Sequence, residues 1–211
     1  YLAYSIVLSM TYFDERPSGQ RTDEAIAIAK TSVQLDEQDA MNRFVYGRAL
    51  LAQRAYLDAY NQLKIALELN PNLAVAHCGL GDCLAYEGRI REAIPYFEKA
   101  VKLGSYDPQR WAFFSYGALA HIFSGDYERA VEWATAAIGI PNCHYWPYAH
   151  RVAALGHGGQ SAQCTTAVRE LMQQKPNFSV EYAQGRLFYL KSPMQIELYV
   201  EGLRKAGVGV A

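Results

Sequence analysis

The sequence has no long apolar run and almost no net charge. No stretch reaches the roughly 18 consecutive apolar residues of a membrane-spanning helix, so we expect no membrane insertion. The formal net charge is -1, which gives no electrostatic reason to expect nucleic acid or an anionic membrane as a partner. Apolar residues make up 51% of the chain, so it has enough material for a sizeable core and is not disordered.

Cysteine is scarce, and its spacing excludes the common metal and redox motifs. The four cysteines are Cys78, Cys83, Cys143 and Cys164. None forms the close pair of a zinc site or a redox motif, so we interpret them as small packed residues of a cytoplasmic protein. His150 and His157 would lie two helical turns apart, about 10 Å along the axis, which is too far for one zinc ion. We therefore predict no metal and no cofactor.

Motifs of catalysis are also missing. The sequence contains no phosphate-binding glycine loop that follows a strand and no Gly-x-Ser-x-Gly elbow. Carboxylate pairs such as Asp36 and Glu37 fall in predicted turns. We expect no enzymatic activity in this chain.

The apolar start of the chain, residues 1–13, is too short to cross a bilayer and lacks the basic leader of a signal peptide. The sequence opens at Tyr1 with no initiator methionine. We expect the chain to be a piece of a longer protein.

What the sequence does contain is an internal repeat, carried by small side chains at a period of 34 residues. One track comprises Ala25, Ala59, Ala93, Ala130 and Cys164. A second comprises Ser32, Ala66, Ala100, Ala137 and Leu171. A third, at predicted turns, comprises Glu37, Pro71, Ser105, Asn142 and Pro176. All three tracks share one insertion of three residues near residues 108–110, which indicates one repeating unit.

The residue types suit a pair of antiparallel helices. Small residues such as Ala59 let the second helix of a unit approach the first, and Gly47 and Gly81 do the same from the first helix. Proline closes a unit because it cannot continue a helix. Glycines such as Gly88 and Gly125 supply the backbone angles of the turn inside each hairpin.

This pattern resembles the tetratricopeptide repeat family over roughly residues 1–178. The best-preserved unit has Tyr46, Gly47, Leu50, Tyr56, Ala59, Leu63, Ala66 and Pro71. The fourth unit has Ala118 where the motif has glycine. The resemblance implies an all-α, right-handed superhelix of about five helical hairpins, a solenoid in which neighbours cover each other's apolar stripes.

The repeat also divides the chain into units. We predict a degenerate first hairpin over 1–39, with an irregular loop over 14–21, and four further units over 40–73, 74–107, 108–144 and 145–178. Residues 179–211 would form C-terminal capping helices and a tail, because Ser192 and Pro193 signal a helix start and Gly207 a stop.

The last third of the chain resembles the C-terminal repeat region of multidomain bacterial signalling proteins. The segments that carry this likeness are 107–111, 125–130, 140–142, 148–156 and 198–207. In such proteins a class III adenylate cyclase domain or a winged-helix regulator domain lies upstream. The resemblance implies a regulatory or docking portion of a larger protein.

The family's ligand groove is lined by set positions of each first helix. Carried over, the resemblance implies a groove formed by Phe44, Arg48, Leu51, Cys78, Asp82, Tyr86, Leu119, Phe123, Trp146 and His157. The groove would be mostly apolar, and it lacks most of the basic residues with which chaperone adaptors of this family hold a peptide carboxylate. The alternative is that part of this wall packs against neighbouring repeats.

An apolar groove suits an amphipathic helix or a segment of the parent chain. We therefore predict a protein-interaction scaffold. Two alternatives remain open from the sequence: a self-association module that pairs two chains into a homodimer, and a sensor that binds a peptide or a small ligand in the groove.

Overall fold

The computed structural model describes residues 1–12, 19–159 and 161–209. These residues form twelve α-helices and no strand. Ten of the helices make five consecutive antiparallel pairs. The pairs are α1 (Leu2–Tyr12) with α2 (Gly19–Leu35), α3 (Ala40–Ala52) with α4 (Tyr56–Leu69), α5 (Ala74–Tyr86) with α6 (Ile90–Leu103), α7 (Arg110–Ser124) with α8 (Tyr127–Ile138), and α9 (Trp146–Gly158) with α10 (Ser161–Gln174). The expected all-α solenoid of five hairpins is confirmed, and each predicted unit contains one pair.

The predicted loop over 14–21 lies largely outside the described residues, and α2 begins at Gly19. Within the described parts of the chain, no helix has both the length and the apolarity needed to span a membrane.

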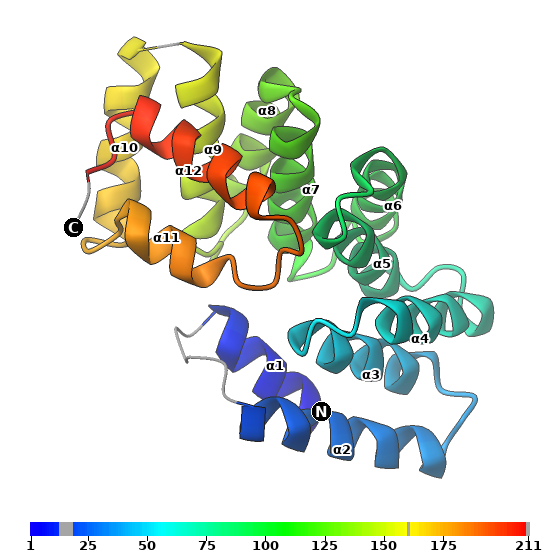
Figure 1. The fold of residues 1–211 in the computed structure, drawn as a ribbon. Coiled ribbons are helices and arrows are strands. Elements are labelled where there is room, and N and C mark those ends of the chain that lie inside the picture. Colours follow the sequence, from blue (N-terminus) through cyan, green and yellow to red (C-terminus); the bar gives the residue numbers. More distant parts are fainter. Residues whose placement is uncertain (13–18, 160, 210–211) are drawn as a thin grey trace.

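The two helices of a hairpin pack against each other through small buried side chains. Ala59, Ala93 and Ala130 are fully buried at the crossing of the two helices of their units. A Cβ added at Gly81 would lie 2.8 Å from the ring of Phe97 on the partner helix, so only glycine permits this approach. The second helix of each pair also contacts the first helix of the following pair, which continues the stack along the chain (Figure 1).

The fourth unit shifts its glycine by one residue. A Cβ at Gly117 would collide with the ring of Trp133 on α8, so Gly117 takes the place that the repeat pattern assigns to residue 118. Ala118 is itself fully buried. Part of the three-residue insertion therefore lies before α7. The rest lies within α7, where it changes which residues contact α8.

The last two helices are α11 (Val180–Arg186) and α12 (Pro193–Lys205). The start and stop signals for the second of them are confirmed: Ser192 precedes Pro193, and Gly207 has a φ of 93°. Helix α12 packs on α9 and also on α7, and α10 is not among the helices it contacts in the described part of the chain. It therefore lies across the first helices of two hairpins and does not extend the stack.

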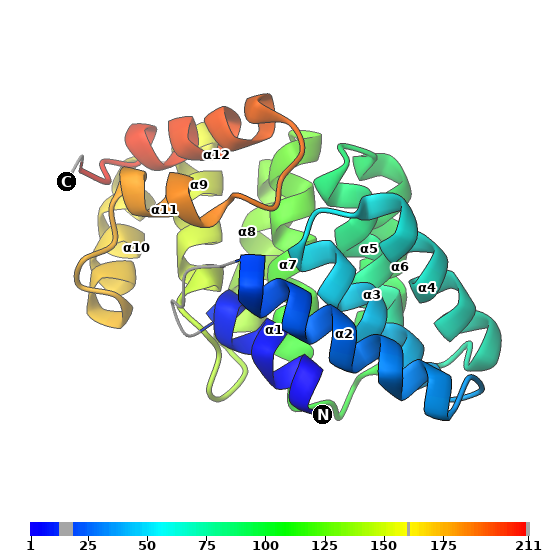
Figure 2. The same ribbon diagram turned by 60° about the horizontal axis from the view of Figure 1, so that its bottom comes forward.

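The solenoid curls until its two ends approach each other. Figures 1 and 2 both show α1 on the side of the molecule that α11 also borders. The hydroxyl of Tyr4 in α1 donates a hydrogen bond to Gln109, just before α7, at 2.9 Å. The concave side is consequently short and largely enclosed, and the first helices of the hairpins face a common interior.

Candidate functional site

The concave wall is formed by α3, α5, α7 and α9, and most of the predicted groove residues are buried in it. Seven of the ten have at most 7% of their surface exposed: Phe44, Leu51, Cys78, Asp82, Tyr86, Leu119 and Trp146. Only Arg48, Phe123 and His157 keep intermediate exposure. Most of the predicted groove residues are thus covered by other side chains of this chain, and their role in binding a partner stays a prediction.

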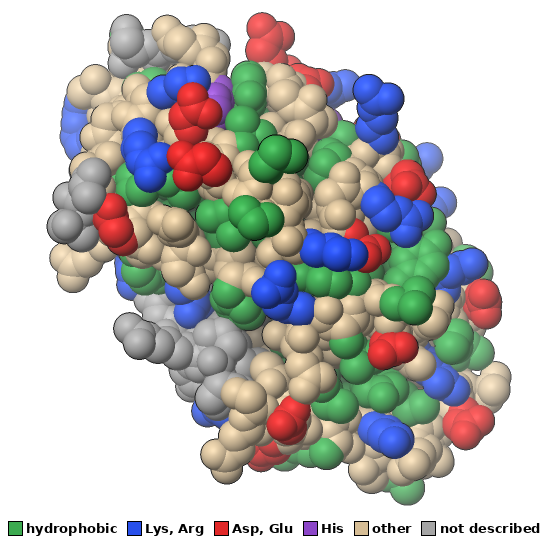
Figure 3. All heavy atoms as spheres, viewed as in Figure 1, with side chains coloured by type: hydrophobic (Ala, Val, Ile, Leu, Met, Phe, Trp, Pro, Cys, Tyr) green, Lys and Arg blue, Asp and Glu red, His purple; other side chains and the backbone are tan. Residues whose placement is uncertain are grey.

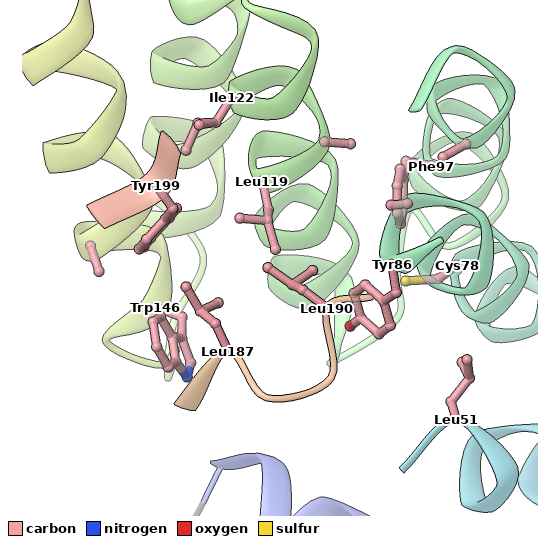
Figure 4. Packing of buried hydrophobic residues seen from close by; sticks show 14 of the residues in the cluster. Leu51, Cys78, Tyr86, Phe97, Leu119, Ile122, Trp146, Leu187, Leu190 and Tyr199 are labelled. Carbon is pink, nitrogen blue, oxygen red and sulfur yellow. The ribbon is translucent and has the colours of Figure 1, made fainter. Parts of the chain in front are cut away.

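The C-terminal part of the wall is covered by α12. On α12, Tyr199, Val200 and Leu203 are fully buried, and Tyr199 contacts α9. The hydroxyl of Tyr199 hydrogen-bonds to Nδ1 of His150 at 2.8 Å, and the ring of His157 contacts the carbonyl oxygen of Leu198 at 2.7 Å. Figure 4 shows Tyr199 between the helices that carry Trp146 and Ile122. We call this surface of α7 and α9 the helix seat.

Small residues set the distance between α12 and the helix seat. A Cβ at Gly156 would collide with the carbonyl oxygen of Gly202, and a Cβ at Gly202 would collide with the carbonyl oxygen of Ala153. The two helices thus cross with their backbones in contact.

The segment between α11 and α12 ties the helix seat to the N-terminal hairpins. The backbone N–H of Lys191 donates to the carbonyl oxygen of Tyr86 at 2.9 Å, and Gln195 donates to that of Ala85 at 2.9 Å. The hydroxyl of Tyr56 donates to the carbonyl oxygen of Tyr189 at 2.7 Å. Two of these bonds are accepted by carbonyl groups in the last turn of α5, where the helix leaves carbonyl groups without a partner of its own.

A central cavity of about 50 Å³ remains between the concave wall, α1 and this segment. Its described lining is Val7, Arg48, Leu51, Ala52, Tyr86, Trp111, Ser115, Tyr116, Trp146, His150, Arg186, Phe188 and Tyr189. Four of these were predicted as groove residues: Arg48, Leu51, Tyr86 and Trp146. Figure 4 shows Leu187 beside Trp146 and Leu190 beside Tyr86, where the C-terminal segment closes over the wall.

The structure adds lining residues that the sequence pattern did not indicate. Trp111 and Tyr116 come from α7. Once the three-residue insertion is counted, neither stands at a groove position of the family, so the repeat pattern gives no signal for them. Arg186, Phe188 and Tyr189 lie beyond the repeats, so no family position could indicate them.

A buried ion pair lies at the edge of the central cavity. Arg48 and Asp82 occupy equivalent places in successive hairpins and are joined by a short contact between Nη1 and Oδ2. The Arg48 guanidinium also lies 5.8 Å from the ring centre of Tyr116. Burial raises the pKa of Asp82 to about 7 despite the opposing effect of Arg48. Its Oδ1 has no hydrogen-bond partner among the residues that the structure describes.

A second, smaller cavity of about 20 Å³ lies on the other side of this pair. Its lining includes Phe44, Cys78 and Asp82, so three more of the predicted groove residues line it, together with Arg48. A space of this size holds about one water molecule. The remaining predicted residues lie apart: Leu119 is buried in α7, Phe123 borders a shallow hollow at the start of α6, and His157 stacks on Tyr127 at 4.7 Å.

Burial also determines the charge of the histidine in the lining of the central cavity. Burial lowers the pKa of His150 to about 3, so this side chain is neutral at physiological pH. The described residues contain no group of three or more His, Cys, Asp or Glu side chains placed to hold a metal ion. Cys78, Cys83 and Cys164 are buried free thiols.

The structure resembles solved helical-repeat proteins. PilW, a widely conserved type IV pilus biogenesis factor, gives a TM-score of 0.70 at 13% identity over 94% of this chain and 89% of PilW. MamA gives 0.62 at 18% identity over 74% of this chain and 90% of MamA. YrrB, described as a TPR protein with an unusual peptide-binding site, gives a TM-score of 0.59 at 17% identity over 84% of this chain and 90% of YrrB. At these identities the likeness shows the fold.

Sequence comparison points the same way. A search of curated proteins gives no match. The tetratricopeptide repeat family model matches residues 44–108 and 78–142, which together span the second, third and fourth hairpins. Residues 44–142 are therefore tetratricopeptide repeats, within a chain that has the fold of a tetratricopeptide-repeat solenoid.

Proposed function

We propose that this chain is a non-catalytic protein-interaction scaffold whose helix seat recognises an amphipathic helix. The observation that carries the proposal is α12 itself, which lies across α7 and α9 with Tyr199, Val200 and Leu203 fully buried. An amphipathic helix laid on an apolar surface is one of the recurring modes of peptide recognition. The peptide-binding site for which YrrB is described supports a role of the same kind here.

In this proposal α12 acts as an internal occupant of the seat, and a partner helix binds when α12 leaves it. This agrees with the prediction that a segment of the parent chain fills the groove. The surrounding surface supports docking of a mixed-charge partner, because acidic and basic side chains are interspersed on the face in Figure 3. The upstream cyclase or winged-helix domain, the bacterial signalling role and the cytoplasmic location stay predictions from the sequence.

The test displaces α12 from the helix seat by mutation and supplies the same helix as a separate peptide. In the Gly202→Leu variant, the new side chain would collide with the backbone at Ala153 and with the ring of His157. We expect this variant to bind a labelled peptide of residues 192–208, measured by fluorescence anisotropy, whereas the unmodified chain binds it at least about tenfold more weakly because its seat is filled.

Two controls make the result specific. The Gly185→Ala variant, at a position where an added Cβ meets nothing within 4 Å, is expected to bind no more peptide than the unmodified chain. A peptide with Tyr199→Ala and Leu203→Ala should not bind the Gly202→Leu chain. If circular dichroism shows that this chain is folded and the native peptide still does not bind, the seat does not accept a separate helix.

A second candidate function is the sensing of a small ligand, and the central cavity favours it. The cavity combines an enclosed position, aromatic walls and two guanidinium groups, a combination typical of small-molecule sites.

A further inference from the structure

The turn between α11 and α12 is held by a surface that lies outside the helix seat. Residues 187–190 form a hydrogen-bonded turn, in which the N–H of Leu190 donates to the carbonyl oxygen of Leu187 at 3.1 Å. Both leucines are buried, Leu187 fully and Leu190 with 2% of its surface exposed. The turn therefore docks through the apolar side chains at its two ends.

The second hairpin contacts the backbone of this turn. The hydroxyl of Tyr56 donates to the carbonyl oxygen of Tyr189 at 2.7 Å. The Arg54 guanidinium donates to the carbonyl oxygen of Leu190 at 3.3 Å, and it also donates to the Tyr56 hydroxyl at 3.1 Å. Because these bonds go to main-chain carbonyl groups, they recognise the shape of the turn and do not depend on the side chains of Tyr189 or Leu190.

The end of α5 contacts the same segment. The N–H of Lys191 donates to the carbonyl oxygen of Tyr86 at 2.9 Å, and the ammonium group of Lys191 lies 3.0 Å from a carboxylate oxygen of Glu87. The rings of Tyr86 and Tyr189 have their centres 4.5 Å apart. A basic residue directly after the turn thus meets a carboxylate. We call the surface formed by Arg54, Tyr56 and the end of α5 the turn site.

The turn site and the helix seat are bridged by the first turn of α12. Only Ser192 separates Lys191 from α12, which begins at Pro193. Gln195, in the first turn of α12, donates to the carbonyl oxygen of Ala85 at 2.9 Å. The end of α5 therefore holds both the turn and the start of the helix. A segment that lies on the helix seat as α12 does brings the residues before it onto the turn site.

We propose that the turn site is a second docking surface and that a partner of this chain carries a two-part element. Its first part is a turn with leucine at the first and fourth positions and a lysine or arginine directly after it, and its second part is an amphipathic helix. The proposal rests on helix docking at the seat and adds the segment that precedes the helix. In the structure, residues 187–205 of the chain itself occupy both surfaces.

The test separates the two parts by peptide length. In the full chain with Leu190→Asp and Gly202→Leu, a carboxylate at a buried position disfavours the docked turn, and the collision at Ala153 displaces α12. We expect a labelled peptide of residues 186–208 to bind this double variant at least about tenfold more tightly than a peptide of residues 192–208, because linked contacts reinforce each other. Fluorescence anisotropy measures both affinities. The longer peptide with Leu187→Ala and Leu190→Ala should lose the advantage.

Substitutions in the turn site should affect the longer peptide alone. Added to the double variant, Tyr56→Phe should weaken the binding of the longer peptide about two- to tenfold, because one hydrogen bond is lost, and leave the shorter peptide unchanged. Arg54→Gly should act in the same way, and glycine suits the positive φ angle of residue 54. Tyr60→Phe, on the same helix as Tyr56, is the matched control and should change neither affinity.

The outcomes distinguish this proposal from helix docking. If the two peptides bind the double variant equally well, the turn site does not recognise a partner, whereas helix docking stands. If neither peptide binds the folded double variant, both proposals are wrong. If Tyr56→Phe weakens both peptides equally, its effect does not arise at the turn, and the assignment of the turn site is wrong.

A second measurement does not require the double variant to fold. In chains with Tyr56→Phe or Arg54→Gly alone, hydrogen exchange of the Lys191 amide should be about two- to tenfold faster than in the unmodified chain, because the docked turn opens more often. The amide of Ala134 in α8 is the internal control and should exchange at the same rate in all three chains. Unchanged exchange at Lys191 in both variants would contradict the role of Arg54 and Tyr56 in holding the turn.

Discussion

Arg54 occupies a backbone position that glycine fills in the three hairpins that follow. The four equivalent turn residues are Arg54, Gly88, Gly125 and Gly159, and all four have positive φ angles, 65° for Arg54. A left-handed conformation costs a non-glycine residue about 1–2 kcal/mol. Here the side chain has an offsetting role, because the Arg54 guanidinium donates to the carbonyl oxygen of Leu190 at 3.3 Å and to the hydroxyl of Tyr56 at 3.1 Å.

Asp82 gives the stability of the molecule a distinctive pH dependence. Burial raises its pKa from 3.8 to about 7, with Arg48 as its ion-pair partner and Cys78 and Tyr86 as further titratable neighbours. Between these two values the unfolded chain has released the proton that the folded chain keeps. This contribution to the free energy of unfolding is therefore fully present below about pH 4 and is lost as the pH rises to about 7.

We expect Asp82→Asn to remove this dependence. Asparagine has the shape of the protonated carboxyl group and does not titrate. The urea midpoint of the original chain, relative to that of Asp82→Asn, should fall between about pH 4 and about pH 7. His150, whose depressed pKa acts in the opposite sense by favouring the fold at higher pH, is present in both chains and cancels in the comparison. A constant difference across this range would refute the role of Asp82.

At the scale of helices, the crossing of α9 and α12 depends on glycine at both contact points. Replacement of Gly156 by alanine places a methyl group against the backbone of Gly202, which has no flexible side chain that can move aside. We expect Gly156→Ala to lower the free energy of unfolding by about 1–3 kcal/mol, the usual cost of overpacking. Chemical denaturation measures it.

The control for this prediction is Gly185→Ala in α11, where the added Cβ meets no atom within 4 Å. Alanine favours a helix over glycine, so this variant should be unchanged or slightly more stable. Equal losses in the two variants would mean that glycine at residue 156 has no special packing role.

The whole molecule combines a closed concave side with an exposed first hairpin. Tyr1, Leu2 and Leu35 are large apolar side chains exposed on α1, on α2 or beside them. Exposed apolar residues gathered at one end of a solenoid are a candidate surface for pairing with a second copy.

Self-association through this hairpin predicts a concentration-dependent mass. Multi-angle light scattering should show a rising average mass as the chain is concentrated, and Leu2→Ser with Leu35→Ser should abolish the rise. Leu57→Ser, at an exposed apolar residue of α4, is the matched control and should not change it. A constant monomeric mass would exclude the homodimer.

Much of this architecture could be predicted because the packing contacts of each repeat recur as a regular pattern in the sequence. Small residues such as Ala59 and Ala93 recur wherever two helices of a unit cross, so their period indicates the hairpins and the boundaries between them. Separate capping signals, Ser192 and Pro193, placed the start of the last helix. The repeat pattern misplaced the glycine of the fourth unit, since a three-residue insertion can be absorbed at several points along a helix.

The candidate site was less predictable for a physical reason. Family positions identify which residues face the concave side, and Arg48, Tyr86 and Trp146 do line the central cavity. They do not say how far the solenoid curls, nor what covers that side. The positions of Arg186 and Tyr189 depend on a segment outside the repeats.

The sequence by itself determined the five hairpins, their order and their inner faces, because contacts within and between adjacent units recur at one fixed spacing. Only the tertiary structure decided that α12 lies on α7 and α9, that Arg48 pairs with Asp82 in a buried place, and that a small cavity remains at the centre. These features arise from contacts between residues far apart in the chain, such as Tyr56 with Tyr189, which no repeat period records.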